Sequence, residues 1–128
     1  MRSEVVLDAS ALLALLNSEP GSDAVAAAFP GVAISAVNLS EVVAKLVERS
    51  MPAEVVRAVL EDLDLAVHPF DAEAAHRAGA LRTATRQLGL SFGDRACLAL
   101  GLQLGRPVLT TDGAWGSLDL GVIVRAIR

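Results

Sequence analysis

Short apolar runs alternate with helix-length segments along the whole sequence, and this alternation restricts the possible folds more than any other feature. The runs are apolar throughout, which is typical of parallel strands buried on both faces. Strands that alternate with helices form layered α/β domains, so we expect a three-layer α/β/α sandwich with a mostly parallel five-stranded sheet. The expected strands are Arg2–Asp8, Val32–Val37, Leu65–Phe70, Pro107–Thr111 and Val122–Val124.

The segments between these runs have the spacing and the end signals of helices. Leu39, Val42 and Leu46 recur at helical spacing. Pro52 suits a first helical turn, and Gly89 marks a helix end. The expected helices are Ala9–Asn17, Ser22–Phe29, Asn38–Arg49, Met51–Leu63, Asp71–Leu88 and a last one opened by Ser91 and closed by Gly105.

The length of 128 residues is that of one domain, so residues 1–128 are expected to fold as a single unit. The longest charge-free stretch lies between Asp23 and Glu41 and is interrupted by a Pro-Gly pair. No run approaches the roughly 20 apolar residues that span a bilayer, so we expect no membrane association. The single cysteine, Cys97, cannot form an internal disulfide, which favours the reducing cytoplasm.

The net charge of −4 argues against a free-standing basic clamp for nucleic acid. Arg82 and Arg86 share one face of an expected helix, where they form either a solvated surface or a contact to an RNA backbone. A nucleic-acid substrate would therefore need another source of positive charge, and a divalent cation is the obvious candidate.

Four acidic residues fall where the expected strands end or where the adjoining helices begin. Asp8 ends the first strand and Asp112 follows the fourth, while Glu41 and Asp94 lie in first helical turns. Ligands of open parallel sheets bind at the carboxyl ends of the strands, so we expect the four side chains at one edge. Neighbouring carboxylates repel each other unless a cation or a proton intervenes. Hard oxygen ligands of this kind suit Mg²⁺ or Mn²⁺.

Helix capping is the alternative explanation for each acid taken singly. The segments Asn38–Glu41 and Ser91–Asp94 resemble capping boxes, and Asp8 and Asp112 have the positions of N-caps. A cap needs only one acceptor, however, and gives no reason for four acids at one sheet edge. The grouping therefore favours the metal site.

Two hydroxyls and one arginine stand beside the acids as candidate supporting residues. Ser10 follows Asp8 by two residues, and Thr110 precedes Asp112 by two. Either hydroxyl would orient a carboxylate or a coordinated water, or else bond to its local backbone. Arg95 follows Asp94 directly and is expected to pair with an acid or to contact phosphate.

Other reactive side chains are expected to be structural. His68 and His76 have no serine or cysteine nucleophile in a recognisable motif. Cys97 lies among apolar residues and is expected in the core, and Trp115 is expected to cover the core as a lid rather than to stack on a base.

The chain resembles the PIN-domain ribonucleases, and among them the VapC-like toxins of type II toxin–antitoxin pairs, in four segments: VVLDASALLALL, ISAVNLSEV, LSFGDRACLALG and VLTTDGAW. The resemblance implies a PIN-like fold and a metal-dependent endoribonuclease in which Mg²⁺ or Mn²⁺ activates water to cleave RNA phosphodiesters. It carries the catalytic and metal-binding roles onto Asp8, Glu41, Asp94 and Asp112, and the supporting hydroxyls onto Ser10 and Thr110.

The same resemblance implies a homodimer and a cognate antitoxin protein as partners. Two alternatives stay open. One is a PIN-fold scaffold that binds metal without cutting RNA. The other is a receiver-type signalling domain, which fits poorly because Lys45, the only lysine, lies in a helix and no aspartate ends the third strand.

Overall fold

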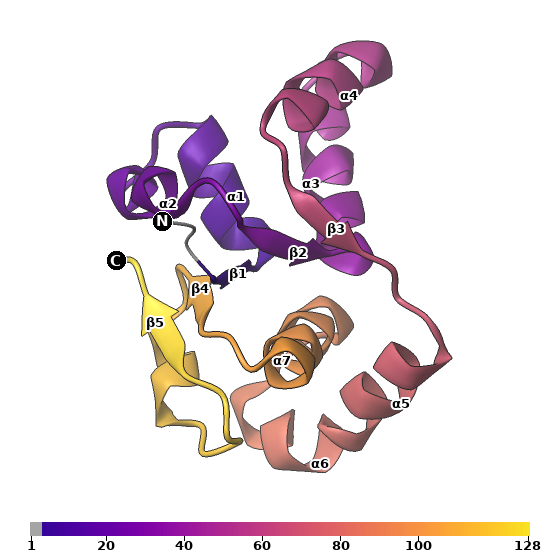
Figure 1. Ribbon diagram of the computed structural model, residues 1–128, viewed down its shortest axis with the longest axis vertical. Helices are drawn as coiled ribbons and strands as arrows, with labels where there is room; N and C mark the ends of the chain where they lie inside the picture. Colours follow the sequence, from indigo (N-terminus) through magenta and orange to yellow (C-terminus); the bar gives the residue numbers. More distant parts are fainter. Residues whose placement is uncertain (1–3) are drawn as a thin grey trace.

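The computed structural model describes residues 4–128. Within this range five strands form one sheet, and every pairing between neighbouring strands is parallel. The strand order is β3-β2-β1-β4-β5, so β1 lies at the centre (Figure 1). The predicted α/β architecture with a five-stranded sheet is confirmed. The strands are β1 (Val6–Leu7), β2 (Ala33–Ser35), β3 (Ala66–His68), β4 (Val108–Thr110) and β5 (Val124–Ala126).

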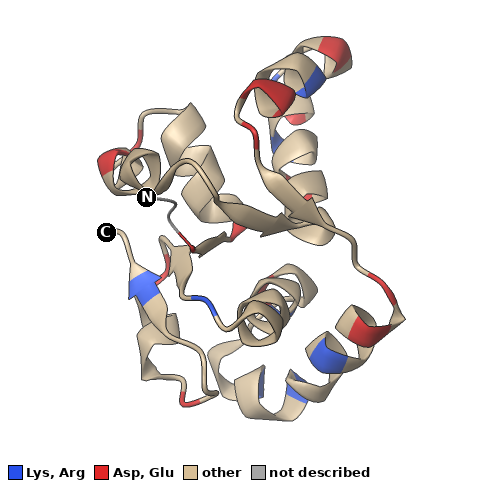
Figure 2. Ribbon diagram, viewed as in Figure 1, with Lys and Arg blue, Asp and Glu red and all other residues tan. Residues whose placement is uncertain are grey.

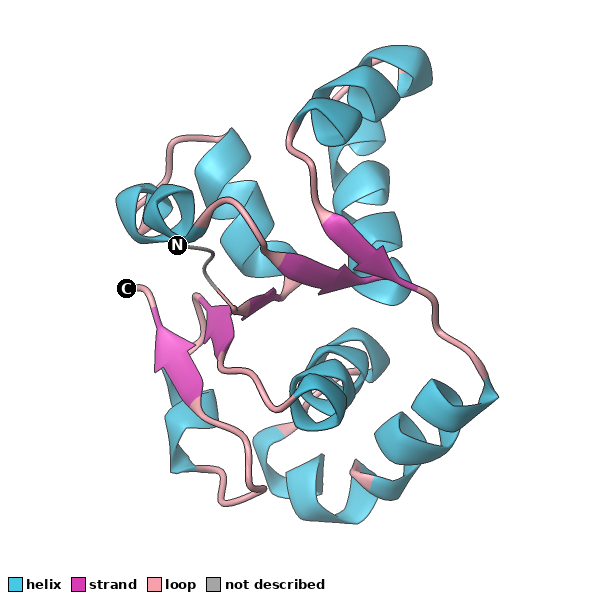
Figure 3. Ribbon diagram, in the orientation of Figure 1, coloured by secondary structure: helices cyan, strands magenta, loops and turns pink. Residues whose placement is uncertain are grey.

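Helices cover both faces of the sheet (Figures 1 and 3). Leu7 belongs to one buried core with Leu12 of α1, and its neighbour Val6 belongs to the other core with Leu98 of α7. Consecutive residues of β1 are therefore buried on opposite faces of the sheet, which explains why this central strand is apolar throughout. The helices are α1 (Ala9–Leu16), α2 (Ser22–Ala28), α3 (Ala36–Glu48), α4 (Ala53–Asp62), α5 (Ala72–Ala80), α6 (Arg82–Thr85) and α7 (Phe92–Leu104), with 3-10 helices η1 (Arg86–Leu88) and η2 (Gly113–Ser117).

The central helix α7 has the ends that its sequence predicts. Ser91 and Asp94 form a reciprocal capping box at its start, and Gly105 ends it in the left-handed conformation with φ of 64°. A Cβ atom on Gly101 would lie 2.7 Å from Cγ2 of Val108, so the glycine lets α7 approach β4 closely. None of the helices in residues 4–128 combines the length and apolarity needed to cross a membrane.

Several predicted boundaries are wrong: α4 begins at Ala53 rather than Met51, and β5 spans Val124–Ala126 rather than Val122–Val124. The helix α3 begins at Ala36 rather than Asn38, because Ser35 is the N-cap and its hydroxyl oxygen accepts from the Val37 N–H at 3.2 Å. The predicted helix over Asp71–Leu88 is broken into α5, α6 and η1. The interruptions lie at Leu81 and after Thr85, and these two residues are joined by a hydrogen bond of 2.8 Å from the Thr85 hydroxyl to the Leu81 carbonyl, a local bond that bends helices.

Candidate active site

The strand order reverses at the central pair β1 and β4, and the candidate site lies at the carboxyl end of this pair. From β1 the chain proceeds outward to β2 and β3, whereas β4 and β5 lie on the other side. Such a reversal leaves a crevice outside the strand ends, where open α/β sheets bind ligands. Asp8 follows β1 at this edge, and Thr110 ends β4 beside it.

Asp8 is held in one orientation by three hydrogen bonds. Its Oδ1 atom accepts from the Ala11 N–H at 2.8 Å, as the N-cap of α1, and from the Ser10 hydroxyl at 2.7 Å. Its Oδ2 atom accepts from the Thr110 hydroxyl at 2.5 Å. Backbone N–H groups in turn donate to both hydroxyls, Thr111 to Ser10 and Asp112 to Thr110, each at 3.1 Å. Ser10 thus contacts the acid beside it in the sequence, whereas Thr110 donates to Asp8 rather than to the carboxylate of its sequence neighbour Asp112.

The Asp8 carboxylate is 5% exposed and has an unusual pKa. Burial raises the pKa of Asp8 from its ordinary value, and the negative charge on Asp94 raises it further. The bonds from Thr110, Ser10 and Ala11 lower it and offset part of this shift. A buried carboxylate of this kind is stabilised by a nearby cation.

Three of the four predicted acids line one cavity of about 230 Å³. Asp8, Glu41 and Asp94 reach it from segments far apart in the sequence, together with Asn38 and Lys45 of α3. The fourth acid, Asp112, is exposed at the end of β4 and is not among the residues that line this cavity. Its Oδ1 atom accepts from the Ala114 N–H at 2.9 Å and so caps η2.

Glu41 lies against the start of α7. Its Oε1 atom accepts from the Asn38 amide at 2.8 Å, and the same amide nitrogen donates to the Gly93 carbonyl at 2.9 Å. A Cβ atom on Gly93 would lie 2.5 Å from both Glu41 carboxylate oxygens, so only glycine leaves room for this carboxylate. Asn38 and Gly93 belong to the site although no sequence motif predicts a role for them. Their only signal was position, three residues before Glu41 and one before Asp94.

The capping explanation holds for three of the acids and fails for the fourth. Asp8, Asp94 and Asp112 all accept hydrogen bonds from backbone N–H groups at helix starts. Glu41 is bonded to a side chain instead, because the predicted Asn38–Glu41 box does not form. Capping and a role in the cavity are compatible, since Asp94 uses Oδ2 for its bond to the Ser91 N–H and Oδ1 has no partner within residues 4–128.

The predicted contact of Arg95 with an acid is wrong. Its guanidinium donates to the Ala78 carbonyl of α5 at 3.1 Å. In the described part of the chain no carboxylate lies within ion-pair distance of it. The side chain therefore connects α7 to α5, which follows from the close packing of these two helices.

The oxygen donors around the cavity fit a hard divalent cation. Carboxylates are preferred ligands of Mg²⁺ and Mn²⁺. Burial raises the pKa of the Cys97 thiol, and the charges on Asp8, Asp94 and Glu41 raise it further. Across residues 4–128, no three acidic, histidine or cysteine side chains converge closely enough to hold an ion unaided. A cation here would keep several waters, as Mg²⁺ commonly does.

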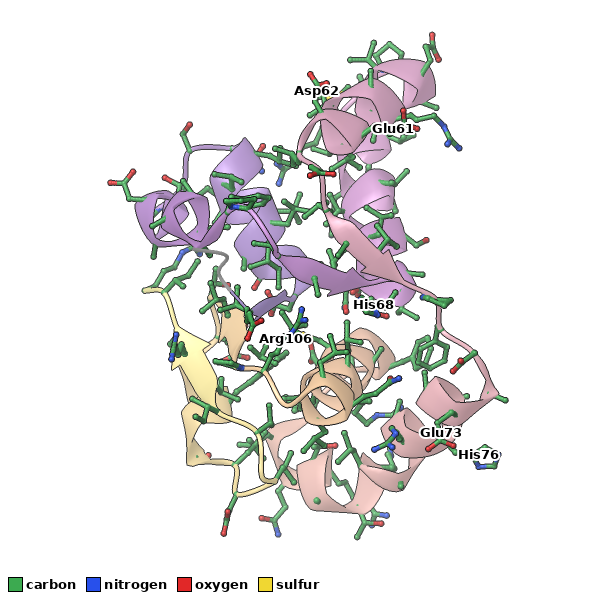
Figure 4. All side chains as sticks on the ribbon, viewed as in Figure 1. Glu61, Asp62, His68, Glu73, His76 and Arg106 are labelled. Carbon is green, nitrogen blue, oxygen red and sulfur yellow. The ribbon has the colours of Figure 1, made fainter. Side chains whose placement is uncertain are left out.

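The remaining reactive side chains lie where the sequence predicts. His68 ends β3 and His76 projects outward from α5, so the two histidines lie in different parts of the fold (Figure 4). Cys97 and Trp115 are buried in the core between the sheet and α7.

Comparison with solved structures shows what this fold is similar to. A toxin-antitoxin complex from Klebsiella pneumoniae matches with a TM-score of 0.77 and 19% identity, over 98% of this chain and 98% of that one. DNA-bound VapBC from Salmonella typhimurium matches with a TM-score of 0.74 and 20% identity, over 100% of each chain. VapC20 from Mycobacterium tuberculosis, a sarcin-ricin loop cleaving toxin, matches with a TM-score of 0.74 and 20% identity, over 91% of this chain and 97% of that one.

The family comparison decides between the architectures that the sequence left open. No curated protein matches the sequence significantly. The profile of the PIN domain matches residues 5–119, almost the whole of the chain. The receiver-type alternative is therefore wrong, and the resemblance in the four sequence segments is confirmed. The chain belongs to the PIN domain family.

Proposed function

We propose that the protein is a metal-dependent endoribonuclease and the toxin of a type II toxin–antitoxin pair, acting through one nuclease domain. The observation that carries this proposal is the cavity at the switch point, where Asp8, Glu41 and Asp94 meet and Asp8 is buried. Caps alone do not require carboxylates from three separate segments to face one cavity. The similarity to a sarcin-ricin loop cleaving toxin and to toxin-antitoxin complexes supports the same function.

Each acid has a distinct contribution in the proposed mechanism. Asp8 is fixed by Ser10 and Thr110, and Asp94 is fixed by the backbone at the start of α7. We retain Asp112 as the fourth acid because its N–H is bonded to the Thr110 hydroxyl, which is bonded to Asp8. When bound, Mg²⁺ or Mn²⁺ would lower the pKa of a water and neutralise charge that develops on the phosphate. The carboxylates orient these groups before reaction, so little reorganisation is needed.

The charge distribution favours RNA binding that depends on the cation. Basic residues are dispersed over α4, α5, α6 and β5 rather than gathered into one patch (Figure 2). Among residues 4–128, Lys45 is the one base that lines the cavity. With a net charge of −4, the chain repels a polyanion at long range. A divalent cation in the cavity reverses the local charge where the scissile phosphate would lie.

RNA cleavage in the presence and absence of metal tests the proposal. The purified chain should cut single-stranded RNA in Mg²⁺ or Mn²⁺, should stop in EDTA, and should recover when the metal is restored. A protein that binds Mn²⁺ but leaves every RNA intact is the scaffold alternative. Cleavage that continues in EDTA would refute the metal-dependent mechanism.

We also propose that the protein forms a homodimer and binds a cognate antitoxin in the cytoplasm. Several large apolar side chains are at least one third exposed, which favours burial in interfaces. They are Val47, Val55, Val59, Val67, Leu88, Phe92 and Ile123. The toxin-antitoxin complexes among the similar structures support an antitoxin partner.

Light scattering should give a mass of two chains, twice 13.3 kDa, at micromolar concentration. The reason is that pairing two copies would remove some of these exposed apolar side chains from water. A mass of one chain across that concentration range would refute the dimer.

A further inference from the structure

The amide of Asn38 connects two elements of the candidate site. Asn38 is 1% exposed in α3, and its nitrogen donates both to the Glu41 carboxylate and to the Gly93 carbonyl in the first turn of α7. The two contacts are 2.8 Å and 2.9 Å, which are good hydrogen-bond distances. One side chain thus joins the helix that carries Glu41 to the helix that carries Asp94.

The hydrogen-bond partners of the Asn38 amide determine its orientation. Both partners are acceptors, so only the NH₂ group of Asn38 can face them. Its Oδ1 atom is then left buried with no hydrogen-bond partner among residues 4–128. An unpaired buried acceptor is unfavourable, and an apolar residue at this position would avoid it. The two donated bonds are the only contacts on the described chain that distinguish asparagine from leucine here.

Glu41 needs such a contact to have a defined position. The residue is exposed, and a long exposed side chain normally samples several rotamers. Its carboxylate lies directly over Gly93, where any side chain would displace it. Asn38 bonds Oε1, and no hydrogen-bond partner of Oε2 lies within the described range. Asn38 thus holds Oε1 of Glu41 in place and leaves Oε2 available.

We propose that Asn38 is a positioning residue, which holds the Glu41 carboxylate over Gly93 so that its second oxygen faces the cation in the cavity. This inference rests on the proposed function, because it assigns Glu41 to the metal site. It adds a specific buried residue that acts through Glu41 and makes no contact with the substrate.

A double-mutant cycle on Mn²⁺ affinity, measured by calorimetry, tests the inference. Asn38→Leu should weaken Mn²⁺ binding by about 10- to 100-fold, the usual effect of losing a residue that orients a ligand. Glu41→Gln should weaken it as well. Because Asn38 acts through Glu41, the double variant should bind no more weakly than Glu41→Gln alone. Losses that simply add, or an Asn38→Leu variant with wild-type affinity, would overturn the inference.

The chain offers a matched control and a second variant. Asn17, the only other asparagine, contacts Glu19 at the end of α1 at 3.4 Å, so Asn17→Leu should leave the Mn²⁺ affinity unchanged. If Asn38→Leu does not fold, Gly93→Ala tests the position of the Glu41 carboxylate from α7. The added methyl group would displace this carboxylate. Wild-type affinity in Gly93→Ala would overturn the inference.

The Mn²⁺ measurements, read together with the RNA assay, distinguish a failure of the role of Asn38 from a failure of the proposed ribonuclease activity. If wild-type protein binds Mn²⁺ and the cycle behaves as expected but no RNA is cut, the proposed activity fails while the role of Asn38 stands. If Glu41→Gln binds Mn²⁺ as wild type does, Glu41 is no ligand and the role of Asn38 is overturned, whatever the RNA assay shows.

Discussion

Replacing Asp94 with asparagine is expected to slow RNA cleavage by at least about 100-fold, comparable to the loss of one preorganised group that stabilises charge in a transition state. The fold should remain intact. Asparagine keeps an amide oxygen that can accept from the Ser91 N–H, so the cap survives and the change in the free energy of unfolding should be about 1 kcal/mol or less. What is lost is the carboxylate charge and the second oxygen, because the free Oδ1 is replaced by an amide NH₂ group that cannot bind a cation.

Asp71→Asn is the matched control for this variant. Asp71 is the N-cap of α5 and accepts from the Ala74 N–H at 2.9 Å, so its carboxylate, like that of Asp94, accepts a backbone N–H at a helix start, but it does not line the cavity. Its substitution should leave cleavage at the wild-type rate. Thermal melting in EDTA and cleavage in Mg²⁺ should be measured for both variants. An Asp94→Asn protein that melts earlier but cuts normally would make Asp94 a cap and nothing more.

Asp8→Asn is expected to have two opposite effects. Mn²⁺ affinity should fall by more than about 100-fold, since even residues that only orient ligands contribute 10- to 100-fold. Stability in EDTA should increase at neutral pH, because the variant no longer buries a carboxylate that burial disfavours. The amide oxygen can still accept from Ala11 and Ser10, so the helix start is preserved.

The gain in stability should depend on pH in a defined direction. Burial raises the pKa of Asp8 above its ordinary value of 3.8, so folding favours the protonated carboxyl. The stabilising contribution of Asp8 is complete below that ordinary value and is lost as the pH rises through the folded-state pKa. The difference in unfolding free energy between variant and wild type should thus grow as the pH rises above the ordinary value of 3.8 and level off above the folded-state pKa, in urea titrations with EDTA. A difference that does not change with pH would show that Asp8 is not desolvated.

The parts of the site that follow local rules could be predicted from the sequence. Asp8 and Asp94 sit at helix starts that capping chemistry dictates, and the strand order brings such starts to one edge. Ser10 and Thr110 were also identifiable, because each lies two residues from an acid. Local spacing together with parallel topology was sufficient for these four positions.

The contacts between separate helices could not be predicted in this way. Asn38 looked like an N-cap, but Ser35 was the better cap and left Asn38 inside α3, facing α7. Arg95 looked like a partner for an acid, but α5 presents the Ala78 carbonyl to it. The break near Thr85 has the same origin, because a continuous helical pattern does not reveal a side chain that bonds back to Leu81. Each case depends on tertiary packing, which overrides local preference.

The location of a bound Mn²⁺ ion tests the central claim most directly. In a crystal soaked with Mn²⁺, the anomalous difference map should show the ion in the cavity lined by Asp8, Glu41 and Asp94, bonded to at least two of these carboxylates. Water should complete its coordination shell. A peak at any other place, or a cavity with no peak at Mn²⁺ concentrations that support RNA cleavage, would contradict the assignment of the active site.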